Sequence, residues 1–405
     1  MHKSAVVLGA GIQGVAAALA LSRDSWRVTL VEQDDEPLNR ASLRNEGKIH
    51  LGFVYANDAT DRTPRLMLEC AMSFGGLLEE WLRAPLPWDK LRSRPFTYCL
   101  ATTSLVPAHV LESRYQSLQD YFLATDGPRR KYLGRSLRCL YTPLTDSGSV
   151  PELQSHFATP FITTPEVAIR LPAFCETLTR AVADEPSITM LCGHQVRDAE
   201  RRTSGFRVSG TRADGTTGEA GSDFLVNCLW ENRLALDATL GIAPRRPWVH
   251  RLKYRVLATL PPALARLPSL TFVLGAYGDI VTYADGSSYL SYYPEAMRGW
   301  CSDLSPPTEW QEPCRGNVPA STTRELTQRL LTALQQAVPG IASSAVTHVD
   351  AGVIFAWGTT DIDDKDSELH TRHDTGVNEH DGYFSIDTGK FTCAPFYAQQ
   401  LVTRV

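Results

Sequence analysis

The sequence predicts an α/β protein (α+β overall) that combines a mixed, largely parallel sheet with a separate antiparallel sheet. Three observations favour this fold class. The chain opens with strand, glycine-rich turn, helix and strand patterns between residues 4 and 32. Short aromatic strand patterns, separated by proline and glycine, follow one another between residues 254 and 293. A second strand–turn–helix pattern begins at Gly382 and closes the chain.

The N-terminal segment that ends at Glu32 predicts a βαβ unit. Residues 6–8 and 27–31 resemble short buried strands, and residues 12–22 a helix rich in alanine and leucine. The intervening turn reads G-x-G-x-x-G, with its glycines at Gly9, Gly11 and Gly14. Glu32 ends the second strand pattern, where a carboxylate can accept hydrogen bonds from a ribose diol free of 2′-phosphate. We therefore expect a Rossmann-like dinucleotide site, with the pyrophosphate at the N-terminus of the helix.

Composition narrows the class of protein. The 405 residues suffice for two domains or one large interleaved domain. A net charge of -5 gives no basic surface for nucleic acid, and no apolar run reaches the length of a transmembrane helix. The nine cysteines contain no C-x-x-C pair, which indicates reduced thiols in a cytoplasm rather than disulfides or a zinc site. Glycines interrupt the first apolar stretch and argue against a signal peptide.

Further along, helix and strand patterns alternate. Residues 41–55 mix charges, glycines and aromatic side chains, which a loop wrapped around a ligand explains and a plain surface loop also allows. Helix patterns occupy residues 64–82, 108–122, 171–183 and 322–337. Strand patterns occupy residues 95–101, 188–191, 224–230, 254–260, 271–274, 280–283, 289–293 and 349–356, with a hairpin-like region at 194–209. At the C-terminus, a strand at 383–386 enters a glycine turn, with Lys390 and Thr392 at the mouth of the final helix.

Several of these motifs resemble the D-amino-acid-oxidase superfamily of FAD enzymes: the N-terminal turn, Glu32, the loop Asn45-Glu-Gly-Lys-Ile-His-Leu-Gly and the terminal Gly-Lys-Phe-Thr. The Lys48-Ile-His50 loop and the Gly389-Lys-Phe-Thr392 turn are most similar to FAD glycerol-3-phosphate dehydrogenases and L-2-hydroxyglutarate dehydrogenases. Residues 224–230 resemble the superfamily's second nucleotide-contacting strand, but larger residues replace its small-residue turn. The resemblance implies an FAD-binding domain built from 1–85, 151–235 and 350–405, and a substrate-binding domain built from 86–150 and 236–349.

The resemblance also implies a place along FAD for each motif. Glu32 would bind the adenosine ribose, Val196 would place backbone against adenine, and the three glycines would frame the pyrophosphate. Loop residues would border the ribityl chain and the flavin: Ser42, Asn45, Gly47, Lys48 and His50. The turn of Gly389, Lys390, Phe391 and Thr392 would bring positive potential to the N1–C2=O edge of the flavin, which stabilises the reduced cofactor.

The expected activity is hydride removal from the C–H beside an amine or hydroxyl of a small polar substrate, to flavin N5. Oxygen or an electron-transfer partner such as a quinone would accept the electrons. An alcohol usually requires a general base, and His50 is the loop histidine best placed for it, although it could instead shape the loop or carry a covalent flavin. Lys390 and Arg298 are the other catalytic candidates. Candidate groups for gripping the substrate are Lys253, Arg255, Tyr283, Tyr289, Tyr292 and Arg298.

One acidic segment and two alternative classes of function complete this interpretation. The acid-rich residues 361–373 lack calcium-loop spacing, so we expect no metal and a solvated loop, with Arg372 or His373 at the site entrance. A flavin monooxygenase using NAD(P)H is disfavoured, because the late turn reads Asp387-Thr-Gly-Lys rather than a Gly-Asp pair. A non-catalytic dinucleotide-binding protein is the second alternative.

Overall fold

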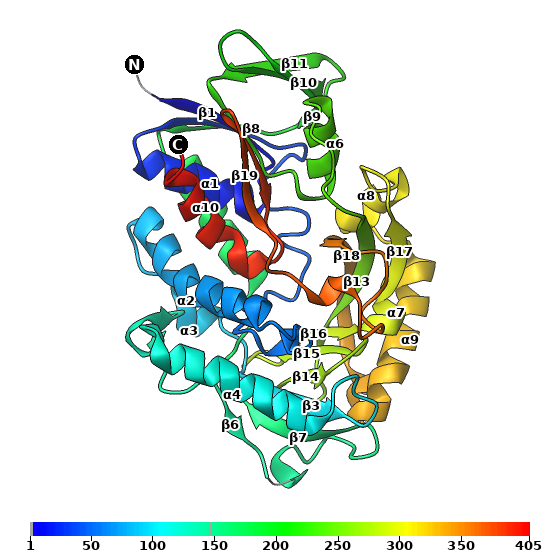
Figure 1. The fold of residues 1–405 in the computed structure, drawn as a ribbon. Helices are drawn as coiled ribbons and strands as arrows, with labels where there is room; N and C mark the ends of the chain where they lie inside the picture. Colours follow the sequence, from blue (N-terminus) through cyan, green and yellow to red (C-terminus); the bar gives the residue numbers. More distant parts are fainter. Residues whose placement is uncertain (1–2, 146) are drawn as a thin grey trace.

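A computed structural model describes residues 3–145 and 147–405 and contains two large sheets (Figure 1). The first has six strands in the order β19-β20-β12-β1-β2-β8, all parallel to their neighbours except β19. Its central strands are short apolar runs buried on both faces, as expected for a sheet that is covered on both sides. The strand bounds are β1 (Ser4–Leu8), β2 (Arg27–Val31), β8 (Ile188–Leu191), β12 (Phe224–Asn227), β19 (Gly376–His380) and β20 (Tyr383–Asp387).

Different layers cover the two faces of this sheet. On one face, α1 (Ile12–Arg23) packs against α10 (Ala394–Val402), and α2 (Arg62–Leu82) packs against both (Figure 1). The run of small residues from Ala16 to Ala18, with Ala20, is buried in α1 and lets these helices approach closely. The other face is covered by a three-stranded sheet and α6 (Arg233–Thr239), through Leu236 and Phe206. The small sheet consists of β9 (His194–Arg201), β10 (Phe206–Arg212) and β11 (Thr217–Ser222).

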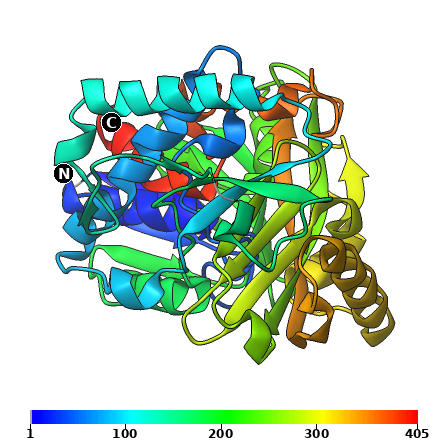
Figure 2. The same ribbon diagram turned by 90° about the horizontal axis from the view of Figure 1, so that it is seen from below.

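The second large sheet has nine strands, in the order β17-β13-β16-β15-β14-β3-β7-β6, with β18 also paired to β13. All neighbours are antiparallel except β14 and β3. The bounds are β3 (Phe96–Ala101), β6 (Thr142–Pro143), β7 (Ala158–Thr163), β13 (Trp248–Thr259), β14 (Ser269–Val273), β15 (Gly278–Thr282), β16 (Ser287–Tyr292), β17 (Met297–Cys301) and β18 (Ala345–Trp357). Helix α9 (Ala320–Ala337) covers its outer side, away from β1 (Figure 2), through Leu330 and Leu334.

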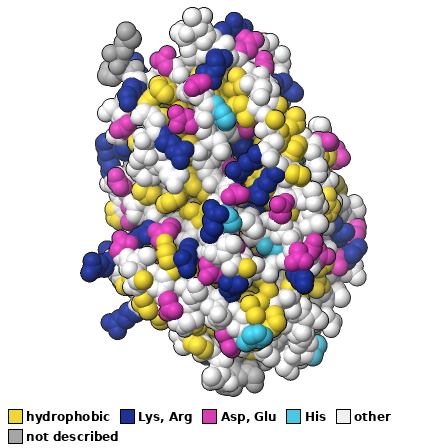
Figure 3. Space-filling view, in the orientation of Figure 1, with side chains coloured by type: hydrophobic (Ala, Val, Ile, Leu, Met, Phe, Trp, Pro, Cys, Tyr) yellow, Lys and Arg dark blue, Asp and Glu magenta, His cyan; other side chains and the backbone are white. Residues whose placement is uncertain are grey.

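Shorter elements complete the described chain. The remaining helices are α3 (Trp88–Leu91), α4 (Ala108–Ala124), α5 (Leu171–Ala183), α7 (Tyr293–Ala296) and α8 (Gln311–Cys314), and β4 (Lys131–Tyr132) pairs with β5 (Arg135–Ser136). Charged side chains of both signs are interspersed over the face seen in Figure 3. Within the described residues, every helix is too short or too polar to cross a membrane.

The predicted fold class is confirmed, and two strands differ from the sequence-based division of the chain. β7 pairs with β3, and β18 pairs with β13 along almost its whole length. Both strands therefore lie in the antiparallel sheet, whereas the predicted boundaries placed residues 158–163 and 350–357 with the nucleotide-binding segments. The cause is long-range pairing, which a local strand pattern does not reveal.

Candidate functional site

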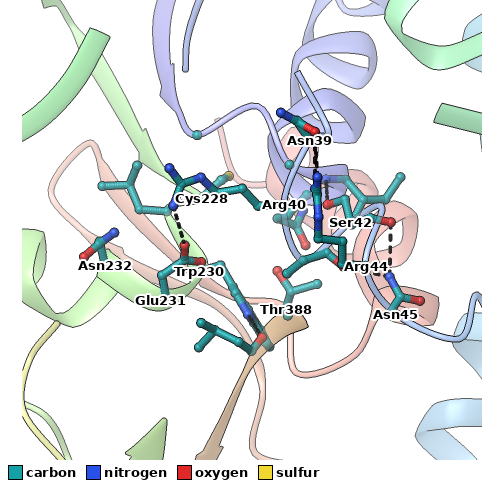
Figure 4. Close-up of a pocket in the computed structure, with 18 of the residues that line it drawn as sticks. Asn39, Arg40, Ser42, Arg44, Asn45, Cys228, Trp230, Glu231, Asn232 and Thr388 are labelled. Atoms are coloured by element: carbon teal, nitrogen blue, oxygen red, sulfur yellow. Dashed lines mark hydrogen bonds and ion pairs between the residues drawn. The ribbon is translucent and has the colours of Figure 1, made fainter. Parts of the chain in front are cut away.

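A cavity of about 590 Å³ lies where the carboxyl ends of β1 and β2 meet the antiparallel sheet (Figure 4). Strands β13 and β18 form the opposite wall. Eleven residues of the predicted site line it: Gly9, Gly11, Glu32, Ser42, Asn45, Lys48, His50, Val196, Gly389, Lys390 and Phe391. The carboxyl edge of a parallel sheet is the usual place for a ligand in open α/β folds.

The glycine turn after β1 is closed by tight backbone contacts. Gly9 has a φ of +87°, and a Cβ there would lie 2.8 Å from the carbonyl oxygen of Cys228. At Gly14, a Cβ would lie 1.8 Å from the carbonyl oxygen of Gly9. Gly14 therefore packs against the backbone of the turn and does not line the cavity. A glycine is needed here because the helix approaches the strand closely.

The start of α1 offers backbone donors to the cavity. The N–H of Ala10 donates to Glu32 Oε2 at 2.8 Å, and that of Ile12 donates to Ser42 Oγ at 2.8 Å. Within residues 3–145 and 147–405, the N–H groups of Gly11 and Gln13 have no acceptor. Two donors at the positive end of a helix fit an anionic group such as a pyrophosphate.

Glu32 stands at one end of the cavity, near Val196 of β9. Its Oε1 also accepts from the N–H of Asp34 at 3.0 Å, and burial raises the pKa of Glu32 above its ordinary value. Arg40 forms a bidentate pair with Asp34, at 2.7 and 2.8 Å, and its Nη1 lies 3.8 Å from Glu231 across the cavity (Figure 4). Arg40 and Glu231 were not among the predicted site residues, because each belongs to a turn without a recognisable sequence motif.

The loop after β2 is shaped by its own side chains. Asn45 Nδ2 donates to the carbonyl oxygens of Ala41 and Ser42 at 2.7 and 3.1 Å, and its Oδ1 accepts from Gly47 N at 2.6 Å. Asn45 therefore fixes the turn that carries the following residues along the cavity. Gly47 lies just outside the lining, against the backbone of Ile169.

Thr392 joins this loop to the C-terminal turn. Its buried hydroxyl donates to the carbonyl oxygen of Lys48 at 3.2 Å and accepts from the N–H of His50 at 3.1 Å. Thr392 therefore lies behind the cavity wall, while Lys390 and Phe391 line it. One hydroxyl thus holds together two segments from opposite ends of the sequence.

The side chain of Lys48 turns away from the cavity into a buried polar cluster. Its Nζ lies 3.1 Å from Asp279, 3.3 Å from Glu166 and 2.5 Å from Thr271 Oγ1. These carboxylates raise the pKa of Lys48 although burial opposes its charge. Lys48 therefore fastens the loop to the antiparallel sheet through its side chain, which the prediction had placed beside the ribityl chain.

His50 and Glu46 form a buried pair at the other end of the cavity. His50 Nε2 lies 3.6 Å from Glu46 Oε1, and Nδ1 has no partner in the described part of the chain. Burial lowers the pKa of His50, which favours the neutral ring. Burial opposes ionisation of Glu46, yet His50, Lys253 and Lys390 hold its pKa well below the usual range. Glu46 and His50 are four residues apart in a non-helical segment, so their spacing did not indicate that they would pair.

Two lysines line the same end of the cavity. Burial, with Arg372 and Lys253 as neighbouring positive charges, lowers the pKa of Lys390 from 10.5 to about 8. Although burial opposes its charge, Tyr289 and Glu46 raise the pKa of Lys253. Of the other predicted gripping residues, Arg255 lines the cavity but is bound to Asp350 at 2.5 and 2.9 Å, and Tyr289 lines it directly.

Arg298 lies outside the cavity, contrary to its prediction as a catalytic residue. A bulge sets Leu252 opposite Gly299 and Lys253 opposite Met297, so Arg298 is left out of the ladder. Its exposed guanidinium lies 3.8 Å from Glu295 and 3.7 Å from Glu325. Two further predicted residues, Tyr283 and Tyr292, are also absent from the lining, and Arg170 covers the ring of Tyr283 at 4.3 Å.

Arg372 and His373 belong to the segment that joins β18 to β19. Arg372 is buried and donates to the carbonyl oxygen of Phe355 at 2.9 Å. His373 Nδ1 lies 3.2 Å from both Asp58 Oδ2 and Thr63 Oγ1. Neither residue lines the cavity.

Among the described residues, no group of three or more histidine, cysteine or acidic side chains could hold a metal ion.

The fold and the cavity together define a dinucleotide-dependent oxidoreductase with a βαβ nucleotide-binding domain and a covering antiparallel sheet. The pattern of the family described as "FAD dependent oxidoreductase" matches residues 4–399. The chain therefore belongs to this family, whose cofactor is FAD. A comparison with curated proteins gave no match.

Solved structures show the same fold at low sequence identity. Glycine oxidase from Geobacillus kaustophilus superposes with a TM-score of 0.67 and 16% identity, covering 99% of this chain and 94% of that one. L-proline dehydrogenase from P. horikoshii gives 0.66 and 15%, covering 100% and 94%. L-α-glycerophosphate oxidase from Mycoplasma pneumoniae gives 0.62 and 13%, covering 99% and 94%.

Proposed function

We propose that the protein oxidises the hydroxyl group of a small anionic compound, with His50 as the base that accepts the hydroxyl proton. The observation that carries this proposal is the buried Nδ1 of His50, which has no partner within the described residues and lies in the cavity-lining segment. A neutral histidine with one free ring nitrogen is the form that a general base requires.

Glu46 supports this role of His50. A carboxylate beside Nε2 favours the tautomer in which Nε2 carries the hydrogen, so the lone pair of Nδ1 remains available. As a proton moves from the substrate hydroxyl to Nδ1, the Glu46 carboxylate stabilises the positive charge that forms on the ring. An amine can lose its proton before binding and needs no such pair, so the arrangement favours a hydroxy compound.

The charges around His50 favour an anionic substrate. Lys253 and Lys390 line this end of the cavity, and Glu46 is the neighbouring carboxylate. Two positive charges against one negative charge leave a site that attracts a carboxylate or phosphate. Attraction of an anion suits the phosphate of the compound named for the glycerophosphate oxidase and equally the carboxylates of glycine and proline, so the preference for a hydroxy compound rests on His50 and Glu46.

The residues present also fit FAD along the rest of the cavity. We propose that Glu32 binds the adenosine ribose, Val196 contacts adenine, and the N–H groups of Gly11 and Gln13 bind the pyrophosphate. The loop from Ser42 to His50 and the turn from Gly389 to Thr392 would then border the flavin. Bound FAD supplies the two-electron acceptor for the hydride equivalent that leaves the substrate carbon.

Anaerobic mixing of the FAD-loaded protein with candidate substrates tests this function. We expect L-α-glycerophosphate or a small 2-hydroxy acid such as lactate or malate to bleach the flavin absorbance, and glycine and L-proline to leave it unchanged. His50→Asn should slow bleaching about 10²- to 10⁴-fold while FAD content is retained. His380→Asn, at an exposed position of β19, is the matched control. Bleaching by the amines alone would overturn the proposal.

A further inference from the structure

Asp361, in the segment between β18 and β19, places its carboxylate on a buried arginine and tyrosine. Oδ1 accepts from Arg251 Nη1 at 3.0 Å and from the hydroxyl of Tyr293 at 2.6 Å. Arg251 Nη1 also donates to the Tyr293 oxygen at 2.5 Å. The side chain of Arg251 is 2% exposed, whereas that of Asp361 is 23% exposed. A carboxylate from a surface segment thus covers a cation that belongs to the protein interior.

Arg251 lies on the strand that forms one wall of the cavity, just outside the lining residues. Arg251, Lys253 and Arg255 alternate along β13 and therefore share one face of the strand. Lys253 and Arg255 line the cavity. The ring of Tyr293 lies 6.0 Å from Lys253 Nζ and 6.0 Å from Arg251 Cζ, so it is close to both cations. Arg251, whose guanidinium donates to the Asp361 carboxylate, therefore occupies the same-face position of β13 next to Lys253, which lines the proposed substrate end.

Positive side chains gather in this region: Lys253, Lys390, Arg251 and Arg372 are neighbours. The carboxylates near them are Glu46, Asp361, Asp279 and Asp387, of which Asp279 also pairs with Lys48 and Asp387 with Arg233. Across residues 3–145 and 147–405, Nε of Arg251 and Nε of Arg372 find no acceptor although both are buried. Buried guanidinium N–H groups without acceptors are costly, so these positions favour a ligand that carries additional anionic oxygens.

We propose that Asp361 is an internal competitor of the substrate: it occupies the place of the substrate's acidic group on Arg251 and Tyr293 and leaves when that group binds. The inference rests on the proposed function, because it assumes an anionic substrate at this end of the cavity. It assigns Asp361 a specificity role, since only a ligand with an acidic group recovers the interactions that Asp361 gives up.

The surrounding segment can release Asp361 while its ends stay in place. Trp357 and Leu369 are 6% and 2% exposed and hold the two ends of the segment in the interior. Between them, residues 361–366 read Asp-Ile-Asp-Asp-Lys-Asp and lie mostly at the surface (orange, in front of β13 in Figure 1). Apart from Asp361, this stretch is held by the packing of Ile362 and by a 2.6 Å hydrogen bond from Asn57 Nδ2 to the Lys365 carbonyl. The Asp364 carbonyl also accepts from the N–H of Ser367 at 3.1 Å and lies 2.9 Å from His370 Nε2. Local opening is therefore inexpensive compared with unfolding.

Titration with acetate tests the competition without any turnover. The change in flavin absorbance of the FAD-loaded protein reports binding, and Asp361→Asn should lower the Kd for acetate about fivefold to tenfold. The reason is that acetate can bind only to the fraction of protein in which Asp361 has left Arg251, so its apparent affinity is reduced in proportion to that fraction. Asp363→Asn removes the same charge from an exposed position further along the segment and should leave the Kd unchanged. An unchanged or higher Kd in Asp361→Asn refutes the inference.

Hydrogen exchange of the wild-type protein gives a second readout. Saturating acetate should speed the exchange of backbone amides in residues 361–366, because Asp361 loses its partners. Slower or unchanged exchange contradicts displacement. These two experiments and the substrate screen can fail separately. If hydroxy compounds bleach the flavin but Asp361→Asn has no effect, the role of Asp361 is refuted and the proposed function is kept. If acetate displaces Asp361 but only amines bleach the flavin, the assignment to hydroxy compounds is refuted and the role of Asp361 is kept.

Discussion

The Thr392 hydroxyl offers the sharpest test of how the cavity is assembled. Thr392→Val keeps the branched shape of the side chain and removes only its hydrogen-bonding capacity. In the wild type this fully buried hydroxyl serves two backbone groups, the N–H of His50 at 3.1 Å and the carbonyl of Lys48 at 3.2 Å. In the variant both groups stay buried and lose their partner.

The size of the effect follows from these two groups. A buried polar group left without a partner costs about 1–3 kcal/mol. Both distances lie at the long end of the usual range, so the lower figure applies to each, and the sum is about 2 kcal/mol. Since about 1.4 kcal/mol is a factor of ten, the folding equilibrium constant should fall about 30-fold.

Urea unfolding followed by tryptophan fluorescence measures this loss. Thr392→Ser retains the hydroxyl and should recover most of the stability. Thr403→Val removes an exposed hydroxyl near the end of α10 and should change the free energy of unfolding by less than about 0.5 kcal/mol. If Thr392→Val is as stable as the wild type, or if the serine variant is equally destabilised, the hydroxyl does not hold the two segments together.

Two further predictions concern charge. Lys390, with a pKa of about 8, is positive below that pH and neutral above it, so acetate binding should weaken up to about tenfold as pH rises from 7 to 9. Lys390→Met should abolish this step, and a step that persists in the variant assigns it to another group. Glu231 faces Arg40 at 3.8 Å in the cavity, while Arg40 also binds Asp34 and Gln311. Glu231→Gln removes a negative charge that repels phosphate beside Arg40, so it should tighten FAD binding about threefold to tenfold. Fluorescence titration with FAD measures this change, Glu309→Gln is the exposed control, and equal affinities would contradict the electrostatic argument.

The sequence predicts the elements whose signals are local. The βαβ unit is specified between Ser4 and Glu32 by apolar patterning and three glycines, and the structure reproduces it. The glycine contacts around Gly14 show why that motif is informative, since no larger residue fits there. Glu32 and Val196 both line the cavity, and their contacts with the adenosine part of FAD stay a prediction.

Several side-chain directions depend on features that are not local sequence signals. Lys48 lines the cavity as expected, but its ammonium group binds Asp279, which belongs to the other sheet. Asp361 was expected in a solvated loop, yet it pairs with Arg251 of β13. Arg298 was predicted in the site but lies outside it, because a bulge changes the direction of its side chain without altering the strand pattern of the sequence. Periodicity indicates which face is apolar but not which distant charge completes a pair.

The order in which the chain visits its two large sheets limits how such a protein can diversify. In chain order, β1 and β2 belong to the parallel sheet, and β3, β6 and β7 belong to the antiparallel sheet. The next strands, β8 and β12, are again in the parallel sheet, β13 to β18 are in the antiparallel sheet, and β19 and β20 are in the parallel sheet. The antiparallel sheet is thus two separate insertions into the nucleotide-binding domain, and both chain ends lie in that domain (Figure 1). Exchange of substrate domains between relatives therefore requires two coordinated recombination events. Stepwise substitution on strands such as β13, whose side chains already line the cavity, is the more accessible evolutionary route to a new substrate.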